Sequence, residues 1–283
     1  MLVKLDHVKK HYATFDLDCT MELAEGCITG VIGRNGAGKT TTFKLILDLI
    51  HPDAGEITIL DEPVSKLNTK KREQIGVVLS DSGFSESLHL EAIARILKPM
   101  YHTFDPADFK KQAQAAGLPL RQPLSQFSNG MKAKAKLLMA LSHHPRLLIL
   151  DEPTAGLDVV ARDEVLDMLR AFMENEQAGI LISSHISSDL EGLCDDIYLI
   201  DQGKVKLHES NETILSEYGL IKVNASQYEK LDKDYLLAVE KEGYGYACLT
   251  NQRAYYQENY PGIVVEKANL DRVLTIMSRG ESK

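Results

Sequence analysis

One run constrains the fold more than any other part of this sequence: Gly33-Arg34-Asn35-Gly36-Ala37-Gly38-Lys39-Thr40. It matches G-x-x-x-x-G-K-[ST], the pattern of a phosphate-binding loop between a strand and a helix. Residues 28–32 before it predict a short buried strand, and residues 41–49 after it predict a helix with one apolar face. Backbone N–H groups of such a loop surround phosphate oxygens, and the helix N-terminus adds partial positive charge. We therefore expect Lys39 to reach the outer phosphates and the Thr40 hydroxyl to bind Mg²⁺.

Charge and cysteine usage narrow the class of protein. The 283 residues can bury a large core, and their formal net charge of −9 argues against broad nucleic-acid binding, although a local basic patch stays possible. Four cysteines without a CxxC pair or metal-ligand spacing indicate reduced thiols in a cytosolic protein. No stretch resembles a signal peptide or reaches the roughly 18 apolar residues of a membrane span, so a membrane partner would have to supply any span.

A second half of the site is predicted at the end of another buried strand. Residues 147–150 are fully apolar, as in a central parallel strand, and two carboxylates, Asp151 and Glu152, follow them directly. Asp151 can hold Mg²⁺, and Glu152 can orient the attacking water or accept its proton. The alternative is an ordinary exit from a strand to a loop, in which the two adjacent carboxylates would have no function.

Further motifs follow in order, and together they resemble the ATP-binding subunit of ABC transporters over residues 2–207. Phe127-Ser128-Asn129-Gly130-Met131 is similar to the family signature LSGGQ. Residues 151–158 resemble the second nucleotide motif with its D-loop, and Ser183-Ser184-His185 resembles the strand end that carries the switch histidine. Tyr12 falls where the family stacks an aromatic ring on adenine, although an aromatic residue in a strand can equally belong to the core.

The resemblance implies an α/β P-loop NTPase fold of the ABC ATPase type. It implies an N-terminal antiparallel β subdomain and a helical insert at about 81–141 within a cassette at 1–210. The resemblance ends near residue 207, and the composition shifts after about residue 210, which predicts a small α/β appendage at 211–283. In the appendage we expect a strand at 220–223, a short helix, a hairpin over 236–249, a helix from 252, a strand at 263–266 and a helix at 270–278. Eight of the eleven tyrosines lie there, either as an RNA-stacking surface or as internal packing.

The resemblance also implies site roles and cofactors, ATP and Mg²⁺. Glu152 and His185 would be catalytic, and Thr40 and Asp151 would hold the metal. The nucleotide-binding set would comprise Tyr12, Gly33, Arg34, Asn35, Gly36, Ala37, Gly38, Lys39, Thr40, Thr41, Ser128, Asn129, Gly130 and Asp158. In the family the loop at Ser128 faces the γ-phosphate bound on the opposite subunit, so two chains sandwich each ATP. Ser128 alone would also suit a helix N-cap.

The chain departs from the family where a glutamine usually follows the strand at 75–79. Here Ser80 and then Asp81 occupy that place. Ser80 is too short to span the gap to the metal, which leaves a bridging water or Asp81 to replace the glutamine. His143 and His144 near the helix end before Pro145 are expected to be solvated.

Two functions remain open from the sequence. The first is an ATPase subunit that drives a separate membrane permease, resembling ABC-2 type exporters, as a homodimer or heterodimer at the inner face of the cell membrane. The helical insert would then receive the permease on an apolar stripe that includes Phe84, Leu88, Leu90, Ile93 and Ile96, although such a stripe can simply be core. The alternative is a soluble single-cassette ATPase, for example of the iron–sulfur assembly type.

Overall fold

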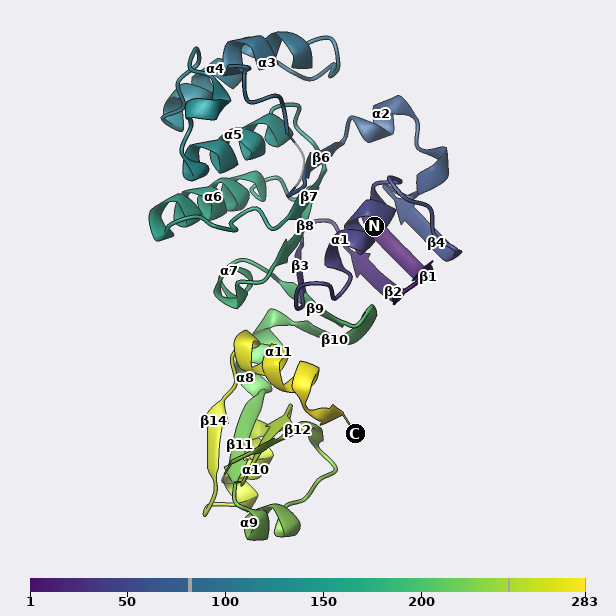
Figure 1. The fold of residues 1–283 in the computed structure, drawn as a ribbon, viewed down its shortest axis with the longest axis vertical. Coiled ribbons are helices and arrows are strands. Elements are labelled where there is room, and N and C mark those ends of the chain that lie inside the picture. Colours follow the sequence, from purple (N-terminus) through teal and green to yellow (C-terminus); the bar gives the residue numbers. More distant parts are fainter. Residues whose placement is uncertain (81–82, 244, 283) are drawn as a thin grey trace.

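The computed structural model describes residues 1–80, 83–243 and 245–282. They form a large sheet flanked by helices and a smaller second sheet (Figure 1). The strands of the large sheet are β1 (Val3–Tyr12), β2 (Phe15–Leu23), β3 (Ile28–Ile32), β4 (Ala54–Ile59), β5 (Glu62–Pro63), β6 (Ile75–Val78), β7 (Leu147–Asp151), β8 (Gly179–Ser184), β9 (Asp196–Asp201) and β10 (Lys204–Ser210). Their spatial order is β5-β4-β1-β2-β10-β9-β3-β8-β7-β6.

Five neighbouring strands of this sheet, β9, β3, β8, β7 and β6, run parallel. Every residue of β3, β7 and β8 is buried, which explains their nearly continuous apolar sequences. The predicted strands at 28–32 and 147–150 are thereby confirmed. Because parallel strands end at the same edge, the phosphate-binding loop, Asp151 and Ser184 all emerge there.

On the other side of the sheet the described strand pairs are antiparallel, apart from β10 with β2, which is parallel. β2 and β4 both pair with β1, and the β1–β2 hairpin closes with Tyr12 opposite Phe15. Helix α1 (Lys39–Ile46) begins two residues before the predicted start and ends three before the predicted end. It starts early because Gly38 takes the left-handed conformation at the N-cap, and the chain turns again at Asp48, whose φ is +58°.

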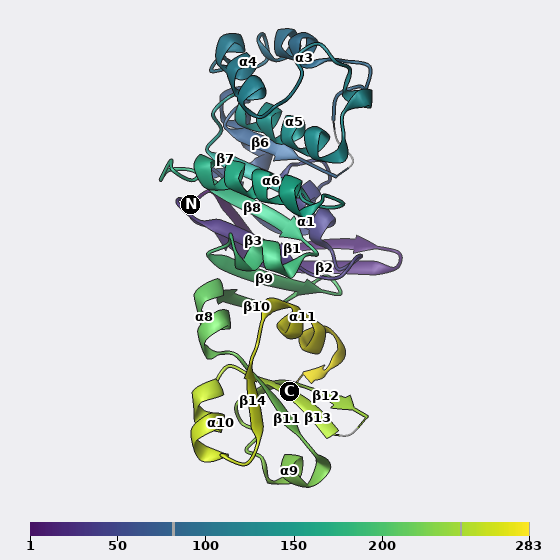
Figure 2. The same ribbon diagram turned by 90° about the vertical axis from the view of Figure 1, so that its left-hand side faces the viewer.

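The helical insert consists of α3 (Leu90–Leu97), α4 (Pro106–Ala115) and α5 (Asn129–Leu141), which lie together at one end of the molecule (Figures 1 and 2). α6 (Val159–Phe172) packs against α5. Short helical segments occur at α2 (Thr69–Arg72), Val64–Lys66 and Leu124–Gln126. Leu90 and Ile93 of the apolar stripe are buried in the core of the insert, while Ile96 is 38% exposed.

The expectation that both histidines near the end of α5 are solvated is wrong for His143. His144 is exposed, but His143 is 3% exposed and its ring stacks on Tyr101 with 4.1 Å between centroids. Its Nε2 donates to the carbonyl of Ile75 over 3.3 Å. The reason is tertiary: the segment after α3 places Tyr101 over a helix end that the local sequence leaves uncovered.

Residues after β10 form the second sheet, in the order β14-β11-β13-β12-β15. Its strands are β11 (Gly219–Val223), β12 (Leu236–Glu242), β13 (Gly245–Thr250), β14 (Val264–Lys267) and β15 (Glu281–Ser282), with helices α8 (Asn211–Glu217), α9 (Ala225–Lys230), α10 (Arg253–Asn259) and α11 (Leu270–Arg279). The expected elements are present, and α8 and β15 are additional. Much of the tyrosine cluster is internal packing: Tyr256 is fully buried, and the rings of Tyr228 and Tyr246 stack at 4.1 Å.

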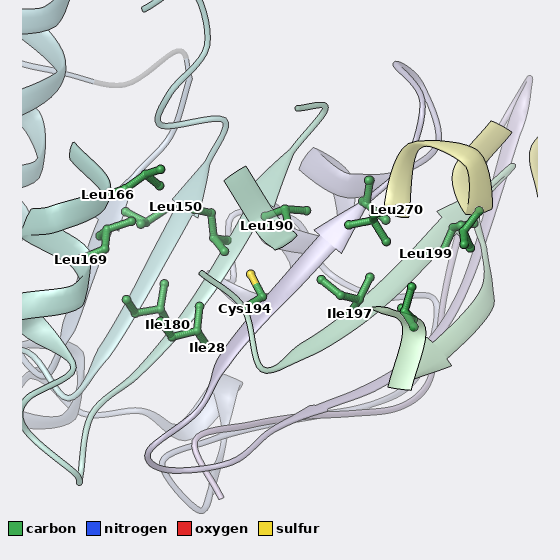
Figure 3. Close-up of a cluster of buried hydrophobic side chains, with 14 of the residues drawn as sticks. Ile28, Leu150, Leu166, Leu169, Ile180, Leu190, Cys194, Ile197, Leu199 and Leu270 are labelled. Carbon is green, nitrogen blue, oxygen red and sulfur yellow. The ribbon is translucent and has the colours of Figure 1, made fainter. Parts of the chain in front are cut away.

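One apolar cluster joins the two sheets. It includes residues of the large sheet together with Leu270, Val273 and Ile276 of α11. Figure 3 shows Leu270 near Leu199 in this cluster. All four cysteines are free, and three of them are buried. Among the described residues, no helix combines the length and apolar character that crossing a membrane requires.

Candidate functional site

The loop between β3 and α1 has a backbone that its glycines make possible. Gly36 and Gly38 have φ values of +80° and +117°, which side chains other than glycine rarely adopt. A Cβ at Gly33 would lie 2.3 Å from the carbonyl oxygen of Ile200, so the loop could not approach β9 so closely with any larger residue. Within the described residues no side chain caps α1 at Gly38, which suits a helix whose first turn is to face an anion.

Lys39 lies folded back over this loop. Its side chain is buried, and Nζ donates to the carbonyl of Gly33 over 2.7 Å. The same ammonium group lies 3.4 Å from Oε1 of Glu152, which comes from the end of β7. Lys39 thus connects the two motifs that are more than a hundred residues apart in the sequence, and its charge is placed where phosphate oxygens would enter.

A cavity of about 460 Å³ opens between the loop and the end of β7. Its lining consists of Thr14, Phe15, Arg34, Asn35, Gly36, Gly38, Lys39, Thr40, Thr41, Ser80, Asp151 and Glu152. The volume is in the usual range of small-molecule sites. Most of the predicted phosphate-binding residues, the metal pair and Glu152 therefore share one cavity.

The predicted metal ligands form a close pair. Thr40 Oγ1 donates to Asp151 Oδ2 over 2.8 Å, and Ser183 Oγ donates to the other oxygen, Asp151 Oδ1, over 2.6 Å. A hydroxyl and a carboxylate are hard oxygen ligands, and Mg²⁺ in phosphate sites commonly takes one or two such protein ligands beside phosphates and waters. No cluster of three or more acidic, His or Cys side chains suited to a metal occurs in the described ranges, so the chain offers this pair and no preformed cage.

Glu152 is held in an unusual conformation. Its φ is +55°, and its backbone N–H donates to both the carbonyl and the hydroxyl oxygen of Ser183. His185 Nδ1 lies 2.5 Å from Glu152 Oε2, and the backbone N–H of His185 donates to the same oxygen over 3.1 Å. Positive φ in a residue other than glycine marks stored strain, which is common at functional sites. The geometry brings the two predicted catalytic side chains into direct contact.

Phe15 is a cavity residue that the sequence reasoning missed. Tyr12, which was expected to stack on adenine, is not among the residues that line the cavity, and its side chain is 47% exposed. The two rings are neighbours, with 6.4 Å between centroids. The signal was present: two aromatic residues flank a two-residue turn, so both had to lie at the same hairpin end.

The signature-like segment lies away from this cavity. Ser128 caps α5, since its Oγ accepts from the N–H of Met131 over 3.2 Å, and Ser128 and Asn129 are exposed. Gly130 is needed for packing, because a Cβ there would lie 2.7 Å from Cβ of Ala161 on α6. Ser128 is not among the described residues that line the cavity of its own chain. Its role in ATP binding therefore stays a prediction.

Asp158 and Ser80 complete the predicted set. Asp158 caps α6, accepting at Oδ1 from the N–H of Ala161 over 2.9 Å. Next to it, Val159 and Val160 are each 70% exposed, which is unusual for apolar side chains. Ser80 lines the cavity, while Asp81, its suggested substitute for the family's glutamine, lies outside the described residues.

Comparison with known proteins agrees with this geometry. Residues 17–155 match the family model described as ABC transporter. The chain is 34% identical over 187 residues to the bacitracin transport ATP-binding protein BcrA of Bacillus licheniformis, covering 65% of this chain and 61% of that protein. It is 29% identical to the linearmycin resistance ATP-binding protein LnrL of Bacillus subtilis, covering 84% of this chain and 78% of that protein. The match with BcrA thus spans less than two thirds of that relative's length.

Solved structures extend the comparison to three dimensions. A structure titled as the ATP binding subunit of an ABC transporter superposes with a TM-score of 0.68 at 29% identity, covering 76% of this chain and 92% of that one. The cassette MJ0796, solved as a dimer bound to ADP and Pi, superposes with a TM-score of 0.66 at 21% identity, covering 74% of this chain and 99% of that one, which supports the fold alone. The chain therefore belongs to the family of ABC transporter ATP-binding proteins and has the α/β fold of a P-loop ABC ATPase.

Proposed function

We propose that this chain binds and hydrolyses ATP with Mg²⁺ as the ATPase subunit of an ABC transporter. The observation that carries the proposal is the convergence of Lys39, Glu152 and His185 beside the Thr40–Asp151 pair. A phosphate-binding lysine, a metal pair and a carboxylate held by a histidine are the parts that hydrolysis of a nucleoside triphosphate needs. The cassette comprises residues 1–210, with its helical insert at about 81–141, and residues 211–283 form the appendage.

The proposed mechanism assigns a separate task to each group. The loop at 33–40 receives the phosphates through its backbone N–H groups, and Lys39 Nζ turns from the Gly33 carbonyl to the phosphate oxygens. Thr40 and Asp151 would hold Mg²⁺, which when bound would supply positive charge that offsets the phosphates. Glu152 orients the attacking water and accepts its proton. His185 and Ser183 fix the Glu152 carboxylate and backbone, so the base is positioned before substrate arrives.

We further propose that two cassettes close around ATP. The Ser128–Gly130 segment begins α5, where backbone N–H groups can bind an anion, and it does not line the nucleotide cavity of its own chain. Val159 and Val160 present an exposed apolar surface beside the D-loop residue Asp158, which burial in a dimer would cover. The second cassette is either another copy of this chain or a different ABC ATPase subunit.

The partner in this proposal is a membrane permease that the cassette drives from the cytoplasmic face. The relatives are named for bacitracin transport, linearmycin resistance and Nod factor export, which favours a transport-coupled subunit, and an exporter in particular, over a soluble ATPase. The groove between β6 and the helical insert, lined by apolar residues such as Phe84, Met100 and Tyr101, is where the permease would dock.

Replacing Glu152 by glutamine tests the proposal directly. The amide keeps the size of the side chain but cannot accept the proton, so hydrolysis should fall at least about a hundredfold while ATP is still bound. Closed dimers should accumulate with ATP, measured by size-exclusion chromatography with light scattering. The same variant, affinity-purified from its native membranes, should bring down a polytopic membrane protein.

Lys39→Ala is the matched control for nucleotide binding. It should lose ATP affinity and dimerisation together, because the phosphates lose their lysine. Hydrolysis by Glu152→Gln at the wild-type rate would remove Glu152 from the mechanism, and unchanged ATP binding by Lys39→Ala would remove the loop. Purification with no membrane partner from membranes that contain the tagged chain would favour the soluble alternative.

A further inference from the structure

A five-residue helix, α7 (Ser187–Glu191), connects the catalytic strand end to the C-terminal part of the chain. It begins two residues after His185. A helix this short is unstable on its own, so its position depends on the contacts that other elements make with it. The orientation of His185 toward Glu152 therefore depends in part on what holds α7.

On the cassette side, α7 is fixed by a buried hydrogen bond. Thr154 Oγ1 donates to Asp189 Oδ2 over 2.6 Å, and both side chains are at most 2% exposed. Thr154 follows Glu152 by two positions in the same loop. α7 is thereby tied to the segment that carries the proposed base as well as to the one that carries the histidine.

On the other side, α7 is held by the C-terminal helix α11. The Ser187 hydroxyl, itself 3% exposed, donates to Oδ1 of Asp271, and Glu191 Oε1 accepts from the N–H of Leu270 over 2.5 Å. Between these two polar contacts, Leu190 of α7 and Leu270 of α11 are both fully buried in one cluster (Figure 3). α11 also packs on β12 and β13, so it links α7 to the second sheet.

α11 also lines a cavity that borders the nucleotide loop. This cavity, the second that the loop lines, has a volume of about 530 Å³. Leu274 of α11 lines it together with His185 and the loop residues Gly33 to Ala37. Leu274 of α11 therefore shares one cavity with the switch histidine and the phosphate-binding loop.

We infer that Asp271 is a positioning residue for ATP hydrolysis, and that through Ser187 it holds α7 and hence His185 in register with Glu152. This inference rests on the proposed ATPase function. It assigns the C-terminal residues a part in turnover: a movement of α11 breaks the Asp271–Ser187 bond and loosens His185 while the lysine and the metal pair stay in place. Asp271 touches neither substrate nor reacting atoms, so it acts on the rate of hydrolysis and not on ATP binding.

Steady-state ATPase assays on the full chain test this. Asp271→Ala should lower kcat about tenfold with KM for ATP and nucleotide affinity unchanged. Asp271→Asn, whose amide oxygen can accept the same hydrogen bond, should restore most of the rate. Ser187→Ala should resemble Asp271→Ala, and the double variant should be no slower than either single one.

Arg272→Ala is the matched control on the same helix. Arg272 contacts Glu242 of β12 at 3.7 Å, so the variant removes a polar contact of α11 with the second sheet and leaves α7 alone. Its kcat should stay within twofold of wild type. A loss of kcat equal to that of Asp271→Ala would show general damage to α11 and overturn the inference, as would an Asp271→Ala enzyme with unchanged kcat.

Amide hydrogen exchange without nucleotide separates this inference from the proposed function. In Asp271→Ala, residues 185–191 should exchange faster, while residues 39–46 of α1 should not change. Unchanged exchange over 185–191 overturns the inference whether or not the chain hydrolyses ATP. Absence of turnover by the wild-type chain, with faster exchange in the variant, overturns the ATPase proposal alone.

Discussion

At the scale of single residues, the candidate site depends on a serine that belongs to no phosphate or metal motif. Ser183 is fully buried at the end of β8. Its hydroxyl donates to Asp151 Oδ1 and accepts from the backbone N–H of Glu152, so one side chain fixes both adjacent carboxylate residues. It also supports the positive φ of Glu152. The proposed metal ligand and the proposed base are thus positioned by a common neighbour.

Ser183→Ala should therefore weaken the metal site without unfolding the chain. Asp151 Oδ1, in a carboxylate group only 1% exposed, would lose its donor, and an outer partner of a metal ligand typically affects metal affinity about tenfold or more. The Mg²⁺ concentration for half-maximal ATPase should rise about tenfold.

The adjacent Ser184→Ala is the control for this change. Ser184 is equally buried, but its Oγ accepts from the N–H of Ile186 and does not contact Asp151. Its Mg²⁺ requirement should stay near that of wild type. If Ser183→Ala and Ser184→Ala show the same Mg²⁺ dependence, the hydroxyl of Ser183 does not orient the metal ligand.

At the scale of elements, the sequence pattern predicted those helices and strands whose formation depends mainly on neighbouring residues. The central strands, the hairpin at 236–249 and the final helix follow from apolar runs, turn residues and amphipathic spacing. α8 was missed although Ser210 caps it by accepting from the N–H of Thr213, because seven residues carry little periodic signal. His143 was misjudged because Tyr101, far away in sequence, covers it. Each motif residue could be predicted from the sequence. The contacts among Glu152, Ser183 and His185 could not, because they arise from the pairing of β7 with β8 in the sheet.

The burial of His143 predicts a pH dependence of stability. Burial lowers the pKa of His143, so below its ordinary value near 6.5 the unfolded chain binds a proton that the folded chain resists. Stability is therefore lost as pH falls through about 6.5 and levels off below the lowered folded pKa. His143→Phe should keep the stacking on Tyr101 and show a smaller difference between melting temperatures at pH 7.5 and pH 5.5.

At pH 7.5 the same variant should be slightly less stable than wild type, because the hydrogen bond from Nε2 to the Ile75 carbonyl is lost. The charge of the exposed neighbour His144 also lowers the pKa of His143, so the pH dependence of His144→Phe should lie between those of wild type and His143→Phe. An identical pH dependence in wild type and His143→Phe would mean that this histidine protonates freely in the folded chain.

At the scale of the whole molecule, the second sheet is part of the structure that supports the cassette. The apolar cluster that contains Ile28 and Leu150 of the parallel sheet continues through Leu190 and Leu199 to Leu270 of α11 (Figure 3). The view of Figure 2 likewise places α11 between β10 and the second sheet. Sequence alone suggested a separate appendage, because its composition changes near residue 210. It could not reveal that the two parts share apolar packing.

A chain truncated after Glu209 should therefore be much less stable than the full chain. It would expose the side of the cluster formed by Leu190, Cys194, Ile197 and Leu199, all at most 6% exposed in the full chain. Complete burial of one such side chain contributes about 1.5–3 kcal/mol, against a net stability of about 5–15 kcal/mol for a typical domain. We expect a lower melting temperature and aggregation by light scattering, whereas truncation after Gly280, which keeps α11, should remain close to wild type. A 1–209 chain that melts like the full chain and stays monomeric would mean that α11 adds nothing to the cassette, and the route from Asp271 to His185 would then lose its structural basis.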